Sequence, residues 1–513
     1  MVAVSVATVL LSNTLAAKAE TWNLGTGGSW NTAVNWNPAS IPNAIGANAT
    51  FNNAASGSNP AQTASGSVVL DGSKTVGSIT FNNDGANAFT YSIANGTGGP
   101  LVFDETGSGP ATITVPAVAG TGNNTISATV TLTDSLVATV NNITASSAAG
   151  ALNLTTAMSG PGGFTKQGDG LATFGTGAKT YAGPTVVNGG RMRISFAARP
   201  SATSSFTVNA GGQLNLISGS AYAFGSGPLN LNGSGATTGP FAAFPGAIRN
   251  DRGIGTVTIS NAVVLQSDTL IHVQAAAGTG ASALPGATNI LVGAISGPGR
   301  LTLTAPSSDL DQGLLVLTAS NSYAGGSFIN GGILVASGST ATFGAGNVTV
   351  DNTASPVSIA RLRIESGVGN AIADTATLSL AGGGSAGVAD QGYADLGTGV
   401  NETVGNLILA GSPQVAGTYG STTSAATFQN NEFFSGSGII TVVVAPTLTI
   451  ALNTPDVLLS WPTNATGFVL QGLAAFSGMN VWTNMADPIV VSGTNNTVTV
   501  GASSGNKFFR LKN

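Results

Sequence analysis

The chain has 513 residues, of which only 7% are charged, with a net charge of −5 and no cysteine. The few, scattered basic residues argue against a nucleic-acid-binding surface. The lack of cysteine excludes disulfides, thiolate catalysis and cysteine-ligated zinc. With 73 glycines and 21 prolines, long helices are disfavoured, whereas 42% hydrophobic residues suffice for a core. We therefore expect an all-β protein whose polar surface consists of Ser, Thr, Asn and Gly.

The first residues form an apolar run from Val2 to Leu11, followed by Ala17-Lys18-Ala19, which fits the small-x-small rule for signal cleavage. We expect residues 1–19 to be a signal peptide cleaved after Ala19, so that the protein is secreted or held at the cell surface. The run is too short to span a membrane, and no integral membrane segment is expected in the mature chain. Because no basic residue precedes the run, either the true start lies upstream of Met1 or the signal is weak. A buried first strand is the alternative to a signal peptide.

Residues 20–66 contain Trp22, Trp30 and Trp36, three of the chain's five tryptophans. Such a segment suits a cap over the open end of a stacked repeat protein, because a terminal repeat needs a distinct covering. Tryptophan rings also stack on sugars, so carbohydrate contact is the alternative. The cap is favoured, since aromatic side chains more often supply buried area than a ligand platform.

Residues 67–445 form a repetitive body in which short strand-like runs with period-two apolar alternation are separated by Gly-Gly, Asn-Gly and Ser-Gly turns. Two blocks in it, near residues 159–195 and 296–337, are imperfect copies of each other. The first begins SGPGGFT and the second SGPGRLT. The repetition predicts a solenoid in which each unit buries its apolar face on its neighbours.

The two copies share a tyrosine and an asparagine at equivalent places. Tyr181 and Tyr323 each lie nine residues before a glycine, and we expect such like residues to stack across coils. Asn188 and Asn330 each precede Gly-Gly, which suits a turn that accepts left-handed backbone or a hydrogen bond to the asparagine's own backbone.

Residues 446–513 form a separate module after Ala445-Pro446. About seven short strand-like runs, separated by turn signals, predict a small β-sandwich. A sorting or attachment role for this module is one hypothesis for the protein.

The repeated blocks resemble the autotransporter-associated β-strand repeat. The resemblance rests on Phe164-Thr-Lys166, Thr180-Tyr-Ala-Gly183 and Val187-Asn-Gly-Gly190, and the second copy has Leu303 in place of the lysine. The resemblance implies a right-handed parallel β-helix of the kind that autotransporter passengers use. The chain is similar to members without a translocator barrel that occur in Verrucomicrobia and Planctomycetes, and its C-terminal module is similar to a tail common among them.

Catalytic residues are hard to find in this sequence. Asp309 and Asp311 would share one face of a strand, but they lie in the insertion of the second copy and are read as solvated turn residues. Asp104 and Glu105 are adjacent and would point apart in a strand. The single histidine, His272, cannot form a metal site of the usual kind or a Ser-His-Asp arrangement. We therefore assign no catalytic, cofactor-binding or metal-ligating residue and expect no cofactor.

The leading hypothesis is an exported, non-enzymatic scaffold or adhesin-like protein that contacts a polysaccharide or cell-surface glycan through a polar Asn, Thr and Ser face. The alternative is a polysaccharide-active β-helix enzyme, either lyase or hydrolase, or its carbohydrate-binding accessory. An acidic cleft with aromatic walls would favour the enzyme, whereas a uniform hydroxyl and amide face would count against it. Residues across coils can also meet in a site that sequence spacing does not show.

Overall fold

The structure of the protein is a computed structural model. It describes residues 19–52, 63–82, 89–117, 123–141, 151–243, 245–250, 255–274, 289–305, 313–351, 359–443, 446–463, 468–474, 481–501 and 507–512. All but the last residue of the predicted signal peptide lies outside these ranges, as do Asp309 and Asp311.

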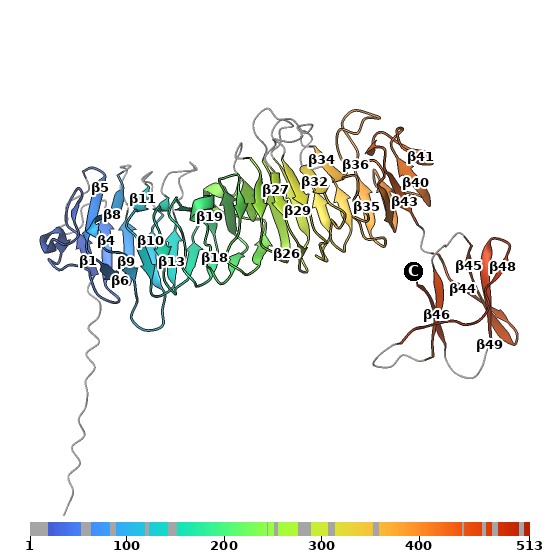
Figure 1. The fold of residues 1–513 in the computed structure, drawn as a ribbon, viewed down its shortest axis with the longest axis horizontal. Coiled ribbons are helices and arrows are strands. Elements are labelled where there is room, and N and C mark those ends of the chain that lie inside the picture. The colour runs from blue at the N-terminus through green and yellow to red at the C-terminus, as the bar shows by residue number, and fades with distance from the viewer. Residues whose placement is uncertain are drawn as a thin grey trace, which may run out of the picture.

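The prediction of an all-β fold is confirmed. The chain forms a long parallel β-helix followed by a small module of antiparallel sheets (Figure 1). The only helical elements in the described part are three short 3-10 turns, η1 (Ala33–Asn35), η2 (Phe196–Ala198) and η3 (Gly239–Phe241). Alternation of buried and half-buried side chains along the strands explains this architecture, because every coil places one residue in two on the common core.

The coils have up to three sides that carry strands, and the strands on one side pair in parallel with those of neighbouring coils. We call the sides face 1, face 2 and face 3, in the order in which the chain visits them. Face 1 consists of β1 (Ala19–Trp22), β4 (Asn48–Asn52), β7 (Ser78–Asn82), β10 (Ala111–Val115), β13 (Leu136–Val140), β16 (Phe164–Gln167), β18 (Thr185–Val187), β20 (Phe206–Val208), β23 (Leu229–Gly233), the first half of β26 (Val263–His272) and β28 (Ile295–Ser296).

Faces 2 and 3 run beside it. Face 2 consists of β2 (Gly28–Ser29), β5 (Gly66–Asp71), β8 (Tyr91–Gly98), β11 (Asn124–Ile126), β14 (Leu152–Leu154), β17 (Leu171–Phe174), β19 (Gly190–Ile194), β21 (Gly212–Leu216), β24 (Ile248–Asn250), the second half of β26, β29 (Leu301–Thr304), β31 (Ser327–Ile329), β33 (Val348–Val350), β35 (Thr377–Leu380) and β38 (Asn406–Leu409). Face 3 consists of a four-stranded sheet, β6 (Lys74–Val76), β9 (Leu101–Phe103), β12 (Val130–Leu132) and β15 (Met158–Ser159), and then an eight-stranded one, β22 (Ala221–Tyr222), β25 (Val257–Ile259), β27 (Asn289–Val292), β30 (Leu314–Leu317), β32 (Gly332–Ala336), β34 (Ala360–Ile364), β36 (Tyr393–Leu396) and β42 (Phe434–Gly436).

The two sequence repeats lie on different sides of the solenoid. In the first repeat β16 and β18 belong to face 1, whereas their counterparts β29 and β31 belong to face 2. The shift arises because the solenoid makes a non-integral number of turns between the two copies, so that β28 occupies face 1 directly before β29. Strand β26 pairs with β23 through its first half and with β24 through its second, so it belongs to both faces.

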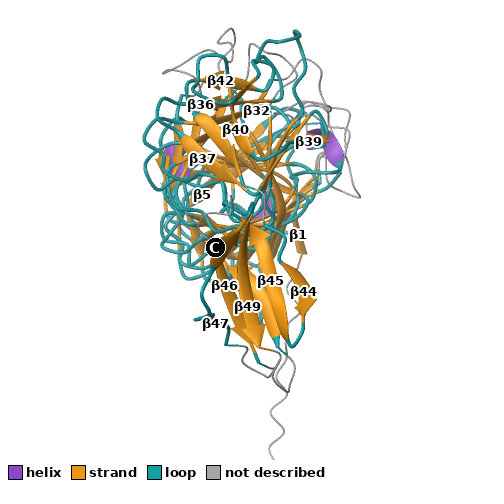
Figure 2. Ribbon diagram, turned by 90° about the vertical axis from the view of Figure 1, so that its right-hand side faces the viewer, coloured by secondary structure: helices purple, strands orange, loops and turns teal. Residues whose placement is uncertain are grey.

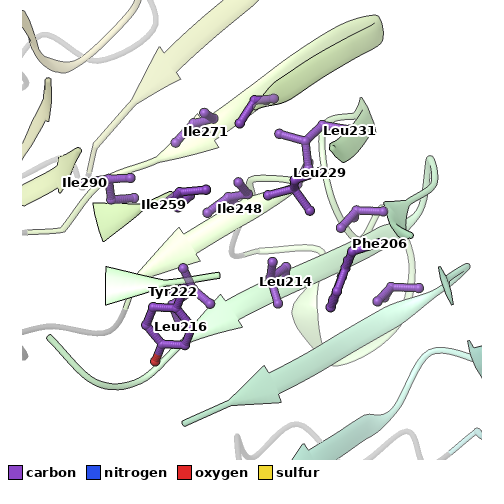
Figure 3. Packing of buried hydrophobic residues seen from close by; sticks show 14 of the residues in the cluster. Phe206, Leu214, Leu216, Tyr222, Leu229, Leu231, Ile248, Ile259, Ile271 and Ile290 are labelled. Carbon is purple, nitrogen blue, oxygen red and sulfur yellow. The ribbon is translucent and has the colours of Figure 1, made fainter. Parts of the chain in front are cut away.

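A continuous core fills the inside of the solenoid with stacked aliphatic and aromatic side chains. Figure 3 shows this packing around Phe206, Leu214, Leu229 and Ile248, which come from successive strands and are fully or almost fully buried. At the N-terminal end, the same core includes the indole rings of Trp22, Trp30 and Trp36. Trp36 belongs to the short strand β3 (Trp36–Asn37).

At the C-terminal end of the solenoid the parallel pattern gives way to antiparallel pairing. β37 (Asn401–Val404) pairs with β43 (Ile439–Val442), which pairs antiparallel with β40 (Gly417–Gly420). Two short strands, β39 (Ser412–Pro413) and β41 (Phe428–Gln429), complete this end.

The C-terminal module contains two small antiparallel sheets that share one core (Figure 2). The first has the order β44 (Thr449–Asn453), β45 (Asp456–Pro462), β49 (Asn495–Gly501) and β48 (Val490–Ser492). The second has the order β47 (Thr483–Asn484), β46 (Val469–Leu473) and β50 (Phe508–Lys512). The buried residues of the core are Leu459, Trp461, Leu470, Val498 and Val500.

Candidate functional site

The three N-terminal tryptophans are buried, each with at most 1% of its surface exposed. Trp36 packs edge-on against Trp22 and Trp30, with ring centroids 5.0 and 4.8 Å away. The indole N–H groups of Trp30 and Trp36 donate to the carbonyls of Pro42 and Trp30, at 3.0 and 2.9 Å. These rings therefore stabilise the core and present no stacking platform for a sugar.

A row of five threonines crosses face 1. The parallel registers place Thr21, Thr50, Thr80, Thr114 and Thr139 beside one another on five adjacent strands. All five side chains are half-buried and point away from the core, because their neighbours in each strand are the buried residues. At a strand separation of about 4.8 Å the row spans roughly 19 Å.

The hydroxyl groups of this threonine row are available to a partner. Within the described part of the chain, none of the five makes a side-chain hydrogen bond to another protein group. A second row lies two residues earlier in β4, β7, β10 and β13, where it is formed by Asn48, Ser78, Thr112 and Val137, and it continues to Thr165 in β16. Neither row contains a charged side chain.

Beyond β13 the same line of face 1 continues with amides. Asn188 Oδ1 accepts from Asn209 Nδ2 at 2.7 Å, and Asn232 Nδ2 donates to Gln266 Oε1 at 3.1 Å. Asn232 Nδ2 also lies 3.4 Å from Asn209 Oδ1. These amides form an amide ladder between coils and so are largely satisfied within the protein.

The expectation for Asn188 and Asn330 needs correction. Neither adopts left-handed backbone; the following glycines do, with φ of +61° at Gly190 and +81° at Gly332. Glycine takes this conformation without the steric cost of a Cβ atom. Asn188 bonds to the next coil rather than to its own backbone, and Asn330 Oδ1 is buried without a hydrogen-bond partner.

Tyr181 and Tyr323 make the same contact in the two repeats. The Tyr181 hydroxyl lies 2.7 Å from Thr185 Oγ1, and the Tyr323 hydroxyl lies 2.6 Å from Ser327 Oγ. Both rings are fully buried, and burial raises the pKa of each phenol above its ordinary value. The two tyrosines belong to different faces, so they repeat a local contact and do not stack on each other.

Lys166, the lysine of the first repeat, is fully buried. Its Nζ donates to the carbonyl oxygens of Gln167, Gly168 and Gly189, at 2.7, 2.7 and 3.0 Å. Three carbonyls match the three hydrogens of an ammonium group. Burial lowers the pKa of Lys166 to about 7. The lysine joins two coils and is not exposed for chemistry with a ligand.

Among the described acidic residues, those that the sequence singled out are tied to neighbouring groups. Asp104 and Glu105 follow β9, and the Asp134 carboxylate accepts the backbone N–H of Glu105 at 2.8 Å. Burial, and then the neighbouring Asp134 carboxylate, raise the pKa of Asp104. This neighbour could not be predicted from sequence spacing, because Asp134 lies one coil away. Glu402 is also buried; desolvation raises its pKa to about 7, and it accepts the N–H groups of Ala371 and Ile372, both at 2.9 Å.

A polar cleft of about 310 Å³ on face 3 is lined by Arg363, Glu365 and Asp395. Asp395 is held by Arg361, which forms an ion pair with it, and by Ser435 Oγ at 3.0 Å. Glu365 Oε2 accepts from Ser337 Oγ at 2.6 Å. Because both carboxylates are tied to neighbouring strands, the cleft resembles an ion-pair network between coils more than an acid and base pair.

His272 is 5% exposed, with Nδ1 3.1 Å from Thr304 Oγ1. Burial, assisted by the positive charges of Arg249 and Arg191, lowers its pKa to about 3, so the ring is neutral. Across the described ranges, no group of three or more His, Asp and Glu side chains could hold a metal ion. No helix in those ranges is long and apolar enough to cross a membrane.

The fold and the inter-coil contacts define a parallel β-helical repeat protein. Residues 164–194 and 311–336 both match the family model of the passenger-associated-transport-repeat. The predicted resemblance to the autotransporter-associated repeat is thereby confirmed, and the chain carries two passenger-type repeats. Comparison with curated proteins and with solved structures gave no significant match.

Proposed function

We propose that the protein is an exported, non-enzymatic scaffold of the adhesin-like kind, which contacts a glycan-bearing surface through face 1. The observation that supports this proposal is the threonine row, whose five hydroxyl groups face away from the core and have no hydrogen-bond partner in the described chain. Hydroxyl groups both donate and accept, as sugar hydroxyls do, so each threonine can bond to a glycan.

The shape of this surface favours a repeating ligand. Three cavities, on face 2, on face 3 and in the C-terminal module, include no threonine of the row. A neutral hydrogen bond contributes only about 0.5–1.5 kcal/mol net. Useful affinity on an open row therefore requires several bonds at once, which a polymeric or solid polysaccharide offers and a single sugar does not.

Replacing Thr50, Thr80 and Thr114 by valine should weaken binding to an insoluble polysaccharide about 10- to 1,000-fold, because three hydrogen bonds are lost. Valine keeps the β-branched shape, so the strands should be retained. Depletion of residues 20–513 from solution by cellulose and by chitin particles measures the effect.

The matched control is the triple replacement of Thr125, Thr131 and Thr173 by valine. These threonines are also half-buried and without side-chain hydrogen bonds, but they lie on faces 2 and 3. Equal binding by both triple variants would contradict a role for face 1. New reducing or unsaturated ends released from the polysaccharide by the wild-type protein would contradict the non-enzymatic part and make the cleft at Asp395 the first site to mutate.

We also propose that residues 1–19 direct export and are removed. Ala19 and Glu20 are the first two residues of β1, so cleavage between them leaves Glu20, which is 4% exposed, at the start of the first strand. The N-terminal residue of protein recovered from the culture medium checks this: a start other than Glu20 would contradict the cleavage site.

A further inference from the structure

The C-terminal module has four edge strands, and three of them are protected in familiar ways. β47 and β48 have only two and three residues, and short edges pair poorly. β50 carries Arg510 and Lys512, and charge on an edge opposes pairing with another strand.

The fourth edge, β44, has no such protection. It has five residues, none charged and none proline, and all five are exposed. Within the described ranges it pairs with β45 alone. Ile450 and Leu452 are 59% and 80% exposed. An exposed, uncharged edge of this kind is a template for a further strand.

The two aliphatic side chains extend the inner face of the sheet. Ile450 lies opposite the buried Leu459, and Leu452 lies opposite Val457, which packs on the module core. Side chains that are directly opposite in an antiparallel pair point to the same face. A strand added at β44 would therefore continue the core outward if it brought aliphatic residues in the same alternation.

The β44 strand of a second copy of the protein has the required alternation of aliphatic residues. It reads polar, aliphatic, small, aliphatic, polar: Thr449, Ile450, Ala451, Leu452 and Asn453. In an antiparallel pairing centred on Ala451, Ile450 of each copy faces Leu452 of the other, and Thr449 faces Asn453. Every position meets a compatible partner, and the two-fold axis closes the assembly.

We propose that the protein forms a two-fold symmetric dimer in which the β44 strands of two copies pair antiparallel, centred on Ala451, into one continuous sheet. The dimer would present two threonine rows, so that a surface with many ligands is held more tightly than by one chain.

The natural absence of cysteine allows a direct test. Residues opposite each other across an antiparallel pair have Cα atoms about 4.5–5.5 Å apart, which a disulfide can bridge. The Ala451→Cys variant of residues 20–513 should therefore form a disulfide-linked dimer under mild oxidation. The Thr449→Cys variant should not, because its two copies would lie about 13 Å apart in this register.

Light scattering of the uncrosslinked protein provides the second measurement. We expect the wild-type mass to approach that of a dimer as concentration rises, and the double variant Ile450→Lys and Leu452→Lys to stay monomeric. Both side chains are already exposed, so the module should still fold. Val490→Lys, on the short edge β48, should still dimerise.

Three results would overturn the proposal: a wild-type protein that stays monomeric at its highest soluble concentration, equal crosslinking of the two cysteine variants, or open-ended growth that Val490→Lys stops. The last would indicate head-to-tail pairing of β44 with β48.

Discussion

Replacing Lys166 by methionine is expected to destabilise the solenoid by about 2–4 kcal/mol. The change removes the donor to three carbonyl oxygens of half-buried residues, and a buried group left without its hydrogen bond costs about 1–3 kcal/mol. Part of this cost is offset because the buried amine no longer has to be desolvated. The shift in the urea midpoint, followed by circular dichroism, measures the difference.

The second repeat offers the control for this substitution. Leu303 occupies the place of Lys166 and is also fully buried, so Leu303→Met changes a side chain of similar volume with no hydrogen bonds to lose. Such a swap should cost less than about 1.5 kcal/mol. Equal losses of stability in Lys166→Met and Leu303→Met would show that Lys166 stabilises the protein through packing and not through its hydrogen bonds to the carbonyl oxygens.

The cost of Lys166→Met should also depend on pH. The pKa of Lys166 is about 7 in the folded protein and 10.5 as the ordinary value. Between these values the unfolded chain binds more protons, so the wild type gains stability as pH rises through this window. The gap between wild type and variant should widen from pH 7 toward pH 10.5. Burial also lowers the pKa of Lys179 to about 7, but this lysine is present in both proteins and does not affect the difference. A gap that stays constant would contradict the lowered pKa.

The fold was accessible from the sequence because its signals are local. Alternating apolar residues, glycine pairs and the two repeated blocks indicate stacked strands without any knowledge of which strands pair. Burial of the N-terminal tryptophans was expected on another ground, because aromatic side chains more often supply buried area than a ligand platform.

The threonine row was not accessible in this way. Thr80 and Thr114 are neighbours only because their strands are in register, and the loops between coils vary in length, so sequence distance does not give the alignment. The pair Asp104 and Asp134 was missed for the same reason. The sequence did suggest that polar residues would share a face, but it could not say which face or which of them would be free of internal hydrogen bonds.

The glycines of the repeated SGPG motif show how tightly the coils are stacked. Gly160 in the first copy and Gly297 in the second have φ of +115° and +107°. A Cβ atom on Gly160 would overlap the Leu132 carbonyl oxygen of the preceding coil, and one on Gly297 would overlap that of Leu265. The motif therefore needs glycine both for its backbone conformation and for space.

Gly160→Ala is expected to destabilise the protein by about 3 kcal/mol or more, because left-handed backbone costs an alanine about 1–2 kcal/mol and overpacking against rigid backbone adds about 1–3 kcal/mol. Gly297→Ala should cost a similar amount, since its surroundings are the same in the second copy. The urea midpoint again provides the measurement.

Gly107→Ala separates the two contributions. Gly107 has φ of +83° but no atom within 4 Å of an added Cβ, so only the conformational cost remains. Its midpoint should fall by clearly less than that of Gly160→Ala. If the two variants lost equal stability, close stacking of the coils would not explain the motif, and the backbone conformation alone would account for the repeated glycine.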